Sequence, residues 1–255
     1  MKTIIKYVLI DLLKNRTILI YTLVLAALTI SVTGMSDNMS KGMLSLLNIT
    51  LLFVPIISIL FATIYFFNSA EFTELLLAQP IRRKSMLMAS YTGIATALGL
   101  AYLAGVGVTV CILYNSLAAI ALVVSGVLLT LIFSALALLI FVVFKDKTRG
   151  IGAAIITALF FTLLFDGLLL AFIYSFSDYP IDEPLLAFIS LNPVDLARIL
   201  VLLQLDAAVM MGYSGALFKK FMGSATGSIY TAVCMFCWMV VPLISAIRIF
   251  RKKDI

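Results

Sequence analysis

The sequence predicts an all-α integral membrane protein, organised as one transmembrane domain over residues 1–255. Of its residues, 64% are hydrophobic and 12% are charged, whereas a soluble domain is about 45–50% apolar and about 25% charged. The mean hydropathy is +1.19. Six apolar runs each reach the length of about 20 residues that a helix needs to cross a bilayer. These observations exclude a water-soluble enzyme.

The N-terminal segment, residues 1–16, predicts an amphipathic helix that lies along the membrane surface. Its apolar residues follow helical spacing and alternate with lysines: Ile4, Ile5, Val8, Leu9, Leu12 and Leu13 against Lys2, Lys6 and Lys14. The alternative is a longer, tilted first span. We favour the surface helix because charged side chains such as Asp11 and Arg16 are costly inside hydrocarbon. No small-residue cleavage site follows, so we expect this segment to persist in the mature protein.

The six predicted spans follow in order along the chain. They run from Thr17 to Gly34, Met43 to Phe67, Met86 to Leu113, Leu117 to Phe144, Ile151 to Tyr174 and Ser228 to Phe250. Fourteen of the 18 Lys and Arg residues fall on one side if both termini are placed there. By the positive-inside rule that side is the cytoplasm. The net charge of +6 is therefore explained by orientation, and we expect no nucleic-acid partner.

The cytoplasmic loop at residues 68–84 predicts a short amphipathic helix. Asn68 and Glu71 have the spacing of a capping box, and Pro80 marks the end. One face carries Phe72, Leu75 and Leu76, and a neighbouring face carries Glu71 and Glu74. Two interpretations stay open on these grounds: docking into a groove of a soluble partner, or resting on the membrane interface beside the basic cluster Arg82, Arg83 and Lys84.

An ionisable residue, Asp166, stands within the fifth predicted span. At 1.5 Å per residue it lies on the order of 20 Å beyond the inner end of that span. An acidic residue at such depth is a functional candidate, and we place it on the translocation path. The alternative is an Asp that pairs with a polar neighbour only to fix helix packing.

The region 175–227 predicts an external or re-entrant element that dips partway into the membrane. Asn192 followed by Pro193 is typical of a helix start, and Asp195 lies in the first turn, near the positive end of the helix dipole. Gly212 and Gly215 are candidate break points. The alternative, a seventh span over residues 197–218, would place Gln204 and Asp206 in lipid and the basic C-terminal cluster outside.

Several function classes are disfavoured by what the sequence lacks. Without histidine, it has no Ser-His-Asp triad and no His-ligated metal. No G-x-x-x-x-G-K-[ST] motif occurs, so we expect ATP hydrolysis on a separate subunit and no cofactor in this chain. An intramembrane protease would need a second carboxylate near Asp166, and none is evident. An ion-driven transporter would predict internal repeats. Cys234 and Cys237 have C-x-x-C spacing but no second pair, which favours apolar packing.

The order of these parts resembles ABC-2 type (type V) ABC transporter permeases. The motif is Ser69-Ala-Glu71-Phe72-Thr-Glu74-Leu75-Leu76-Leu-Ala-Gln79-Pro80-Ile81-Arg82-Arg83. In that family the matching segment is the coupling helix, which docks on an ATPase subunit. The resemblance therefore implies ATPase contacts by Glu71, Phe72, Glu74, Leu75, Gln79, Pro80, Arg82 and Arg83. The family often has Gly between the acidic positions, where this chain has Phe72 and Thr73.

Three further stretches are similar to the permease subfamily that serves nitrous oxide reductase maturation. They are Phe165-Asp166-Gly-Leu-Leu-Leu, Leu191-Asn192-Pro193-Val-Asp195-Leu-Ala-Arg198-Ile-Leu, and Gly212-Tyr213-Ser214-Gly215. The similarity implies a homodimer in the bacterial inner membrane, with a NosF-like ATPase that binds Mg-ATP and a NosD-like periplasmic protein. It implies periplasmic contacts by Asn192, Pro193, Asp195 and Arg198, and export of a sulfur-containing species for copper–sulfide cluster assembly. The alternatives are another cargo (lipid, drug or polysaccharide) or an ion-driven transporter.

Overall fold

The computed structural model describes residues 8–12, 14–36, 38–70, 83–176, 182–205 and 213–252, and for residues 213–224 it describes the backbone. Every regular element in these ranges is a helix. They are α2 (Arg16–Met35), α3 (Met39–Asn68), α5 (Arg83–Tyr102), η1 (Leu103–Gly107), α6 (Val108–Tyr114), α7 (Leu117–Val143), α8 (Lys147–Leu159), η2 (Phe160–Leu164), α9 (Phe165–Ser175), α10 (Asp182–Ser190), α11 (Pro193–Leu202) and α12 (Tyr213–Lys252). The labels η1 and η2 denote π-helical turns inside longer helices.

Six of the described helical stretches are long and apolar enough to cross a membrane. They are Arg16–Met35, Ser40–Asn68, Lys84–Tyr114, Leu117–Val143, Lys147–Ser175 and Ala225–Arg251. Each predicted span is confirmed, with both ends within four residues of the expected ones. We number them span one to span six. Spans three and five each consist of two α-helices joined by a π-helical turn. Because this turn is itself helical, each span is one continuous helix.

The N-terminal helix is separate from span one. Residues 8–12 are helical, with Val8 and Leu12 buried and Asp11 exposed. Asn15 is extended, and its side chain accepts a hydrogen bond from the Thr17 N–H at 2.9 Å. This bond caps α2, which therefore starts anew at Arg16. The alternative of one longer, tilted first span is wrong, because the helix is interrupted at Lys14 and Asn15.

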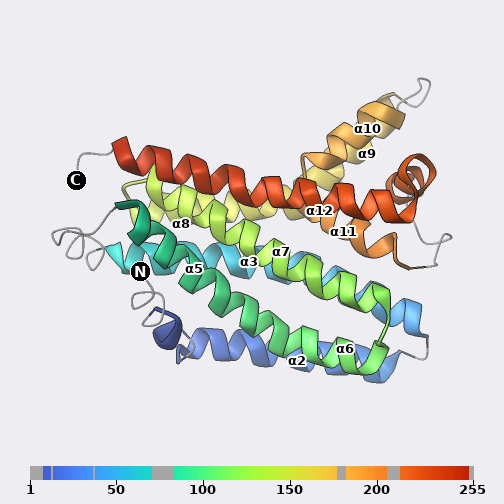
Figure 1. Ribbon diagram of the computed structural model, residues 1–255, viewed down its shortest axis with the longest axis horizontal. Helices are drawn as coiled ribbons and strands as arrows, with labels where there is room; N and C mark the ends of the chain where they lie inside the picture. Colours follow the sequence, from blue (N-terminus) through green and yellow to red (C-terminus); the bar gives the residue numbers. More distant parts are fainter. Residues whose placement is uncertain are drawn as a thin grey trace.

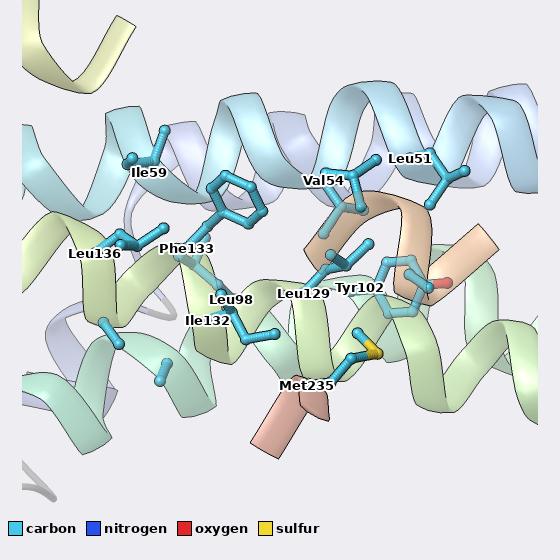
Figure 2. Close-up of a cluster of buried hydrophobic side chains, with 14 of the residues drawn as sticks. Leu51, Val54, Ile59, Leu98, Tyr102, Leu129, Ile132, Phe133, Leu136 and Met235 are labelled. Carbon is cyan, nitrogen blue, oxygen red and sulfur yellow. The ribbon is translucent and has the colours of Figure 1, made fainter. Parts of the chain in front are cut away.

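Span four, α7, is the centre of the bundle. In its most apolar stretch 67% of the residues are buried, against 22% in α2 and in α8–α9. Figure 2 shows side chains of α3, α5, α7 and α12 meeting around it: Leu51, Val54, Ile59, Leu98, Tyr102, Leu129, Ile132, Phe133, Leu136 and Met235. An all-round apolar helix is typical of such a buried position.

Two tyrosines of span three fix its register against α7. The Tyr91 hydroxyl donates to the Leu131 carbonyl, and the Tyr102 hydroxyl donates to the Leu122 carbonyl, both at 3.1 Å. Buried tyrosines need such partners for their hydroxyl groups. The Tyr102 ring fills the space that a Cβ on Gly126 would occupy. A glycine at position 126 is therefore required by close packing.

The helix ends divide the bundle into two ends (Figure 1). The start of α2, the end of α3, the starts of α5 and α8 and the end of α12 lie at one end. This end carries most of the described Lys and Arg side chains, and we call it the basic end. The turns from α2 to α3 and from α6 to α7 lie at the opposite end.

The helices α10 and α11 form a bent pair at the opposite end. A bend of 110° separates Pro184–Ser190 from Pro193–Leu202. The end of α9 and the start of α12 both lie at this end (Figure 1), so the chain enters and leaves on one side. A bend of this kind fits a broken span as well as a re-entrant element, so the re-entrant element stays a prediction. The predicted break at Gly215 is wrong: α12 begins at Tyr213, and Gly215 lies in its first turn. Gly212 and Asp206 lie outside the described residues.

Candidate functional site

Asn192 stands at the bend between α10 and α11 and joins groups from two helices. Its Oδ1 accepts a hydrogen bond from the Val194 N–H at 3.0 Å, which caps α11. Its Nδ2 donates to the Phe161 carbonyl oxygen at 3.1 Å and to Asp195 Oδ2 at 2.8 Å. The side chain is fully buried, at 0% exposure, so its amide is satisfied inside the protein. Asn192 therefore ties the bend to span five.

The Phe161 carbonyl accepts this bond because span five contains the π-helical turn η2. In a regular α-helix the carbonyl of residue 161 would bond to the Phe165 N–H. That N–H donates instead to the Phe160 carbonyl, five residues back. A π-helical turn of this kind inserts one residue and leaves a carbonyl without its helical donor. The Asn192 amide supplies that donor, where an unpaired buried group would cost about 1–3 kcal/mol.

A cluster of charged side chains lies beside this junction. Arg198 Nη1 donates to Asp195 Oδ1 at 2.7 Å and to Asp166 Oδ1 at 3.3 Å, and Arg198 Nη2 donates to Asp166 Oδ2 at 3.0 Å. Two parallel N–H···O bonds to one carboxylate give a strong and geometrically specific pair. The pair joins span five to α11. Asp195 belongs to α11 itself, three residues before Arg198.

The exposure of these side chains differs in a way that matters inside a membrane. Asp195 is 5% exposed, whereas Arg198 is 31% and Asp166 is 38% exposed within this single chain. Charged groups at membrane depth face water or other protein groups, because contact with hydrocarbon is costly. At the depth that the sequence predicts for Asp166, the open side of the Asp166–Arg198 pair would face a water-filled space or another protein surface.

The other side of the bend is held by span six. Ser190 is the last residue of α10. Its carbonyl accepts a hydrogen bond from Trp238 Nε1 at 3.0 Å, and its hydroxyl lies 2.9 Å from the Tyr230 hydroxyl. The Trp238 ring also packs edge-on against the Phe161 ring, with centroids 5.3 Å apart. The bend is thus attached to span six before Asn192 and to span five after it.

The chain is similar in sequence to known transporter proteins. The family model described as "ABC-2 family transporter protein" matches residues 13–255. The chain belongs to the ABC-2 family of transporter proteins. It is also similar to a protein of Stutzerimonas stutzeri named "Probable ABC transporter permease protein NosY". The identity is 27% over 283 aligned positions, which cover 95% of each chain. As an ABC-2 permease, the chain is a membrane component of an ABC transporter. The permeases of this family are not themselves catalytic.

The permease brings four of the predicted site residues together. Asp166, Asn192, Asp195 and Arg198 form one connected set of hydrogen bonds. Pro193 is the first residue of α11 and is buried. Asn192, Pro193 and Asp195 thus make their contacts inside the chain, which favours a structural role for their side chains. Contact of these residues and Arg198 with a periplasmic partner stays a prediction.

The predicted ATPase-docking residues lie mostly outside the described part of the permease. Glu71, Phe72, Glu74, Leu75, Gln79, Pro80 and Arg82 fall in residues 71–82, and of Arg83 only its place at the start of α5 is described. The predicted capping role of Asn68 is wrong. Asn68 is the last helical residue of α3, followed by the C-cap Ser69, and its side chain accepts a hydrogen bond from Lys147. A residue in helical conformation within α3 cannot be the extended N-cap of a following helix.

Sequence reasoning also missed several members of the site. It found no second carboxylate near Asp166, yet Asp195 bonds to the same guanidinium. This arrangement is unlike an aspartic protease, whose two carboxylates share a proton without an intervening cation. The Phe161 carbonyl carries no side-chain signal. Trp238 and Tyr230 could have been noticed, since buried Trp and Tyr need partners for their polar atoms.

Metal-ligating groups do not gather in the described residues. Within them, no three His, Cys, Asp or Glu side chains lie close enough to hold a metal ion. Cys234 and Cys237 are free thiols, the first half-buried and the second exposed. The chemistry of the described site is therefore hydrogen bonding and charge pairing.

Proposed function

We propose that this permease forms the membrane path of an ATP-driven exporter, as a homodimer in the bacterial inner membrane with both termini in the cytoplasm. The observation that carries the proposal is the family match over residues 13–255. The chain lacks a P-loop motif, so Mg-ATP would be bound and hydrolysed by a separate cytoplasmic subunit. Movement of that subunit would enter through the docking segment, residues 68–84, by way of Glu71, Phe72, Glu74, Leu75, Gln79, Pro80, Arg82 and Arg83.

Asp166 is the residue that we place on the translocation path. Its support is the 38% exposure of the side chain in the single chain, at a depth where contact with lipid is costly. A water-filled space between two copies of the permease would hydrate the open side of the Asp166–Arg198 pair. The path would then open alternately to the two sides as the copies move.

We further propose that the cargo is a sulfur-containing species delivered to the periplasm for the copper–sulfide cluster of nitrous oxide reductase. The support is the similarity to the NosY protein along 95% of both chains, together with the three motifs around Asp166, Asn192 and Tyr213. A NosD-like periplasmic protein would be the receiving partner, and a NosF-like protein would be the ATPase.

The docking claim is tested by a charge reversal in the docking segment. The permease is co-expressed with a NosF-like ATPase, and both are purified in detergent. We expect Glu74→Lys to reduce co-purification of the ATPase by at least about five-fold, the lower end of typical coupling effects between sites. Asp11→Lys is the matched control, because Asp11 is an exposed carboxylate outside the docking segment. Equal ATPase recovery with both variants would refute docking through Glu74.

The cargo claim is tested by complementation. The permease, its ATPase and its periplasmic partner are expressed in a bacterium that makes nitrous oxide reductase but lacks its own permease gene. We expect the absorption spectrum of the copper–sulfide cluster to return in the purified reductase. If the complex assembles in the membrane and the cluster is still absent, the cargo belongs to another class, with lipids, drugs and polysaccharides the next candidates.

A further inference from the structure

Spans two and five meet at the point where the docking segment begins. Asn68 ends α3, and Lys147 begins α8 at the same basic end of the bundle (Figure 1). Lys147 Nζ donates a hydrogen bond to Asn68 Oδ1 at 2.7 Å. Any displacement of the docking segment therefore acts first on a helix end that is bonded to span five.

The neighbouring residue, Phe67, makes the tighter contact. Its ring fills the space that a Cβ on Gly150 would occupy, so the two helices approach closely at this point. Gly150 is buried in α8. Gly152, only two residues further along α8, has nothing within 4 Å of an added Cβ. Close packing thus requires a glycine at position 150 and not at position 152.

Span four packs against the other side of the Phe67 ring. Phe67 packs edge-on against Phe141 of α7, with centroids 5.2 Å apart and an interplanar angle of 81°. Phe66 stacks on the same Phe141 ring at 5.7 Å and 26°. Phe67 therefore lies between the central helix and Gly150. We call the set Phe67, Phe141 and Gly150 the inner joint.

Span five connects the inner joint to the charged cluster. It is helical without interruption from Lys147 to Ser175, and Asp166 lies about 24 Å from Gly150 along the helix axis at 1.5 Å per residue. Only 22% of its most apolar stretch is buried, so few contacts oppose its movement as a unit. Its described hydrogen bonds to polar groups of other helices are made by Lys147 at its start, by Phe161 at its middle and by Asp166 in its second half.

We propose that Phe67, seated on Gly150, transmits movement of the docking segment to span five and thereby to the Asp166–Arg198 pair. The inference rests on the proposed function and adds to it the positioning residues that carry the motion. This contact transmits force only if the Phe67 ring and Gly150 stay packed against each other. An added methyl group at position 150 would displace the ring, whereas one at position 152 would meet open space.

The test measures whether span five moves when the ATPase binds nucleotide. The three native cysteines, Cys111, Cys234 and Cys237, are replaced by Ala, and spin labels are attached after Gly34→Cys and Gly167→Cys substitutions. Both glycines have nothing within 4 Å of an added Cβ. The distance distribution between the labels is recorded for the permease–ATPase complex in lipid nanodiscs, with and without ATP and vanadate.

We expect a nucleotide-dependent shift in the complex with Gly152→Ala and a loss of at least about five-fold in the shifted population with Gly150→Ala, the lower end of allosteric coupling. Phe67→Leu alone should also lose the shift, and it serves if Gly150→Ala fails to fold. In the double variant Phe67→Leu/Gly150→Ala, the smaller side chain at position 67 leaves room for the methyl group at position 150. This variant should recover most of the shift.

Three outcomes would overturn the inference. One is an equal shift with Gly150→Ala and Gly152→Ala, and another is the absence of any shift in the unsubstituted joint. Losses that simply add in the double variant would indicate general damage in place of a joint, and would also overturn it. Failure of the proposed function would look different, since the ATPase would then not co-purify with the unmodified permease at all.

Discussion

Replacement of Asn192 by alanine should destabilise the permease far more than the loss of an ordinary helix cap. Asn192→Ala removes the cap of α11 and both amide donor bonds, and it leaves the Phe161 carbonyl of η2 without a donor. Loss of a cap costs about 1 kcal/mol. A buried group left unpaired adds about 1–3 kcal/mol. We therefore expect a total loss of about 3 kcal/mol, most of it from the bonds that join the bend to span five.

The chain provides a matched control in Asn15. Its side chain caps α2 by accepting from the backbone N–H two residues on, at 2.9 Å, just as Asn192 accepts from Val194 at 3.0 Å. Among the hydrogen bonds of the described residues, this cap is the one that the Asn15 side chain makes. Asn15→Ala should thus cost about 1 kcal/mol. Asn192→Ser, which retains a capping oxygen but has no amide, should fall between the two alanine variants.

The assay is thermal unfolding of the purified permease in detergent. At about 2–4 °C per kcal/mol for a chain of this size class, we expect Tm to fall by about 3 °C for Asn15→Ala and about 9 °C for Asn192→Ala. Circular dichroism follows the whole chain, while fluorescence of Trp238, the one tryptophan in the sequence, follows the bend through its bond to Ser190. Equal Tm losses for the two alanine variants would refute the role given to the amide donor.

The same melting assay checks two further expectations. Arg198→Met should cost about 3–5 kcal/mol of stability, because it leaves the buried carboxylate of Asp195 without its cation. Asp166→Asn should cost about 1 kcal/mol, because the Asp166–Arg198 pair is partly exposed. If Asp166 lies on the translocation path, a transport assay of the assembled complex should still show a loss of activity with Asp166→Asn. Gly126→Ala should cost about 1–3 kcal/mol by overpacking against the Tyr102 ring. Similar Tm values for Arg198→Met and Asp166→Asn, or an unchanged Tm for Gly126→Ala, would contradict these assignments.

The spans were predictable because their signal is local. A bilayer requires about 20 consecutive apolar residues in a helix, and that requirement is visible in the sequence without knowledge of any neighbour. The start of α2 was predictable for the same reason: Asp11, Lys14 and Arg16 separate two apolar stretches. Asn15 caps the second stretch, as the structure shows. The helix start at Asn192 and Pro193 was also read from local signals and is confirmed.

Residue types that often mark a helix start or break gave wrong predictions at two positions where the helix continues. Asn68 has the residue type and spacing of a helix N-cap, yet span two extends to it and its amide oxygen bonds to Lys147, 79 residues away. The local pattern could not show how far span two extends or where this side chain finds its partner. Gly215 was expected to break a helix, but one glycine costs only about 1 kcal/mol in a helix, which the 40-residue α12 tolerates.

The members of the charged cluster were each predictable, but their meeting was not. Asp166 was chosen as an acidic residue within a span, Asn192 and Asp195 from the signals of a helix start, and Arg198 from the resemblance to a permease subfamily. Their contact depends on the extra residue of η2, which frees the Phe161 carbonyl, and on the 110° bend before α11. Neither feature has a composition or periodicity that marks it, so the pairing of span five with α11 required the structure.

The unequal burial of the two carboxylates gives the cluster a property that suits a moving part. If span five moves relative to α11, the bonds between Asp166 and Arg198 must break, and so must the bond from the Asn192 amide to the Phe161 carbonyl. The Asp166–Arg198 bonds are partly exposed and therefore cost less to separate than a fully buried pair. The bond between Arg198 and Asp195 lies within α11 and stays intact, because both residues move together. Arg198 thus keeps a buried counter-charge in either position of span five, and no cation is left unpaired at membrane depth. Without Asp195, the same movement would leave both Arg198 and Asp166 without a counter-charge, whereas with Asp195 only the partly exposed Asp166 loses its partner.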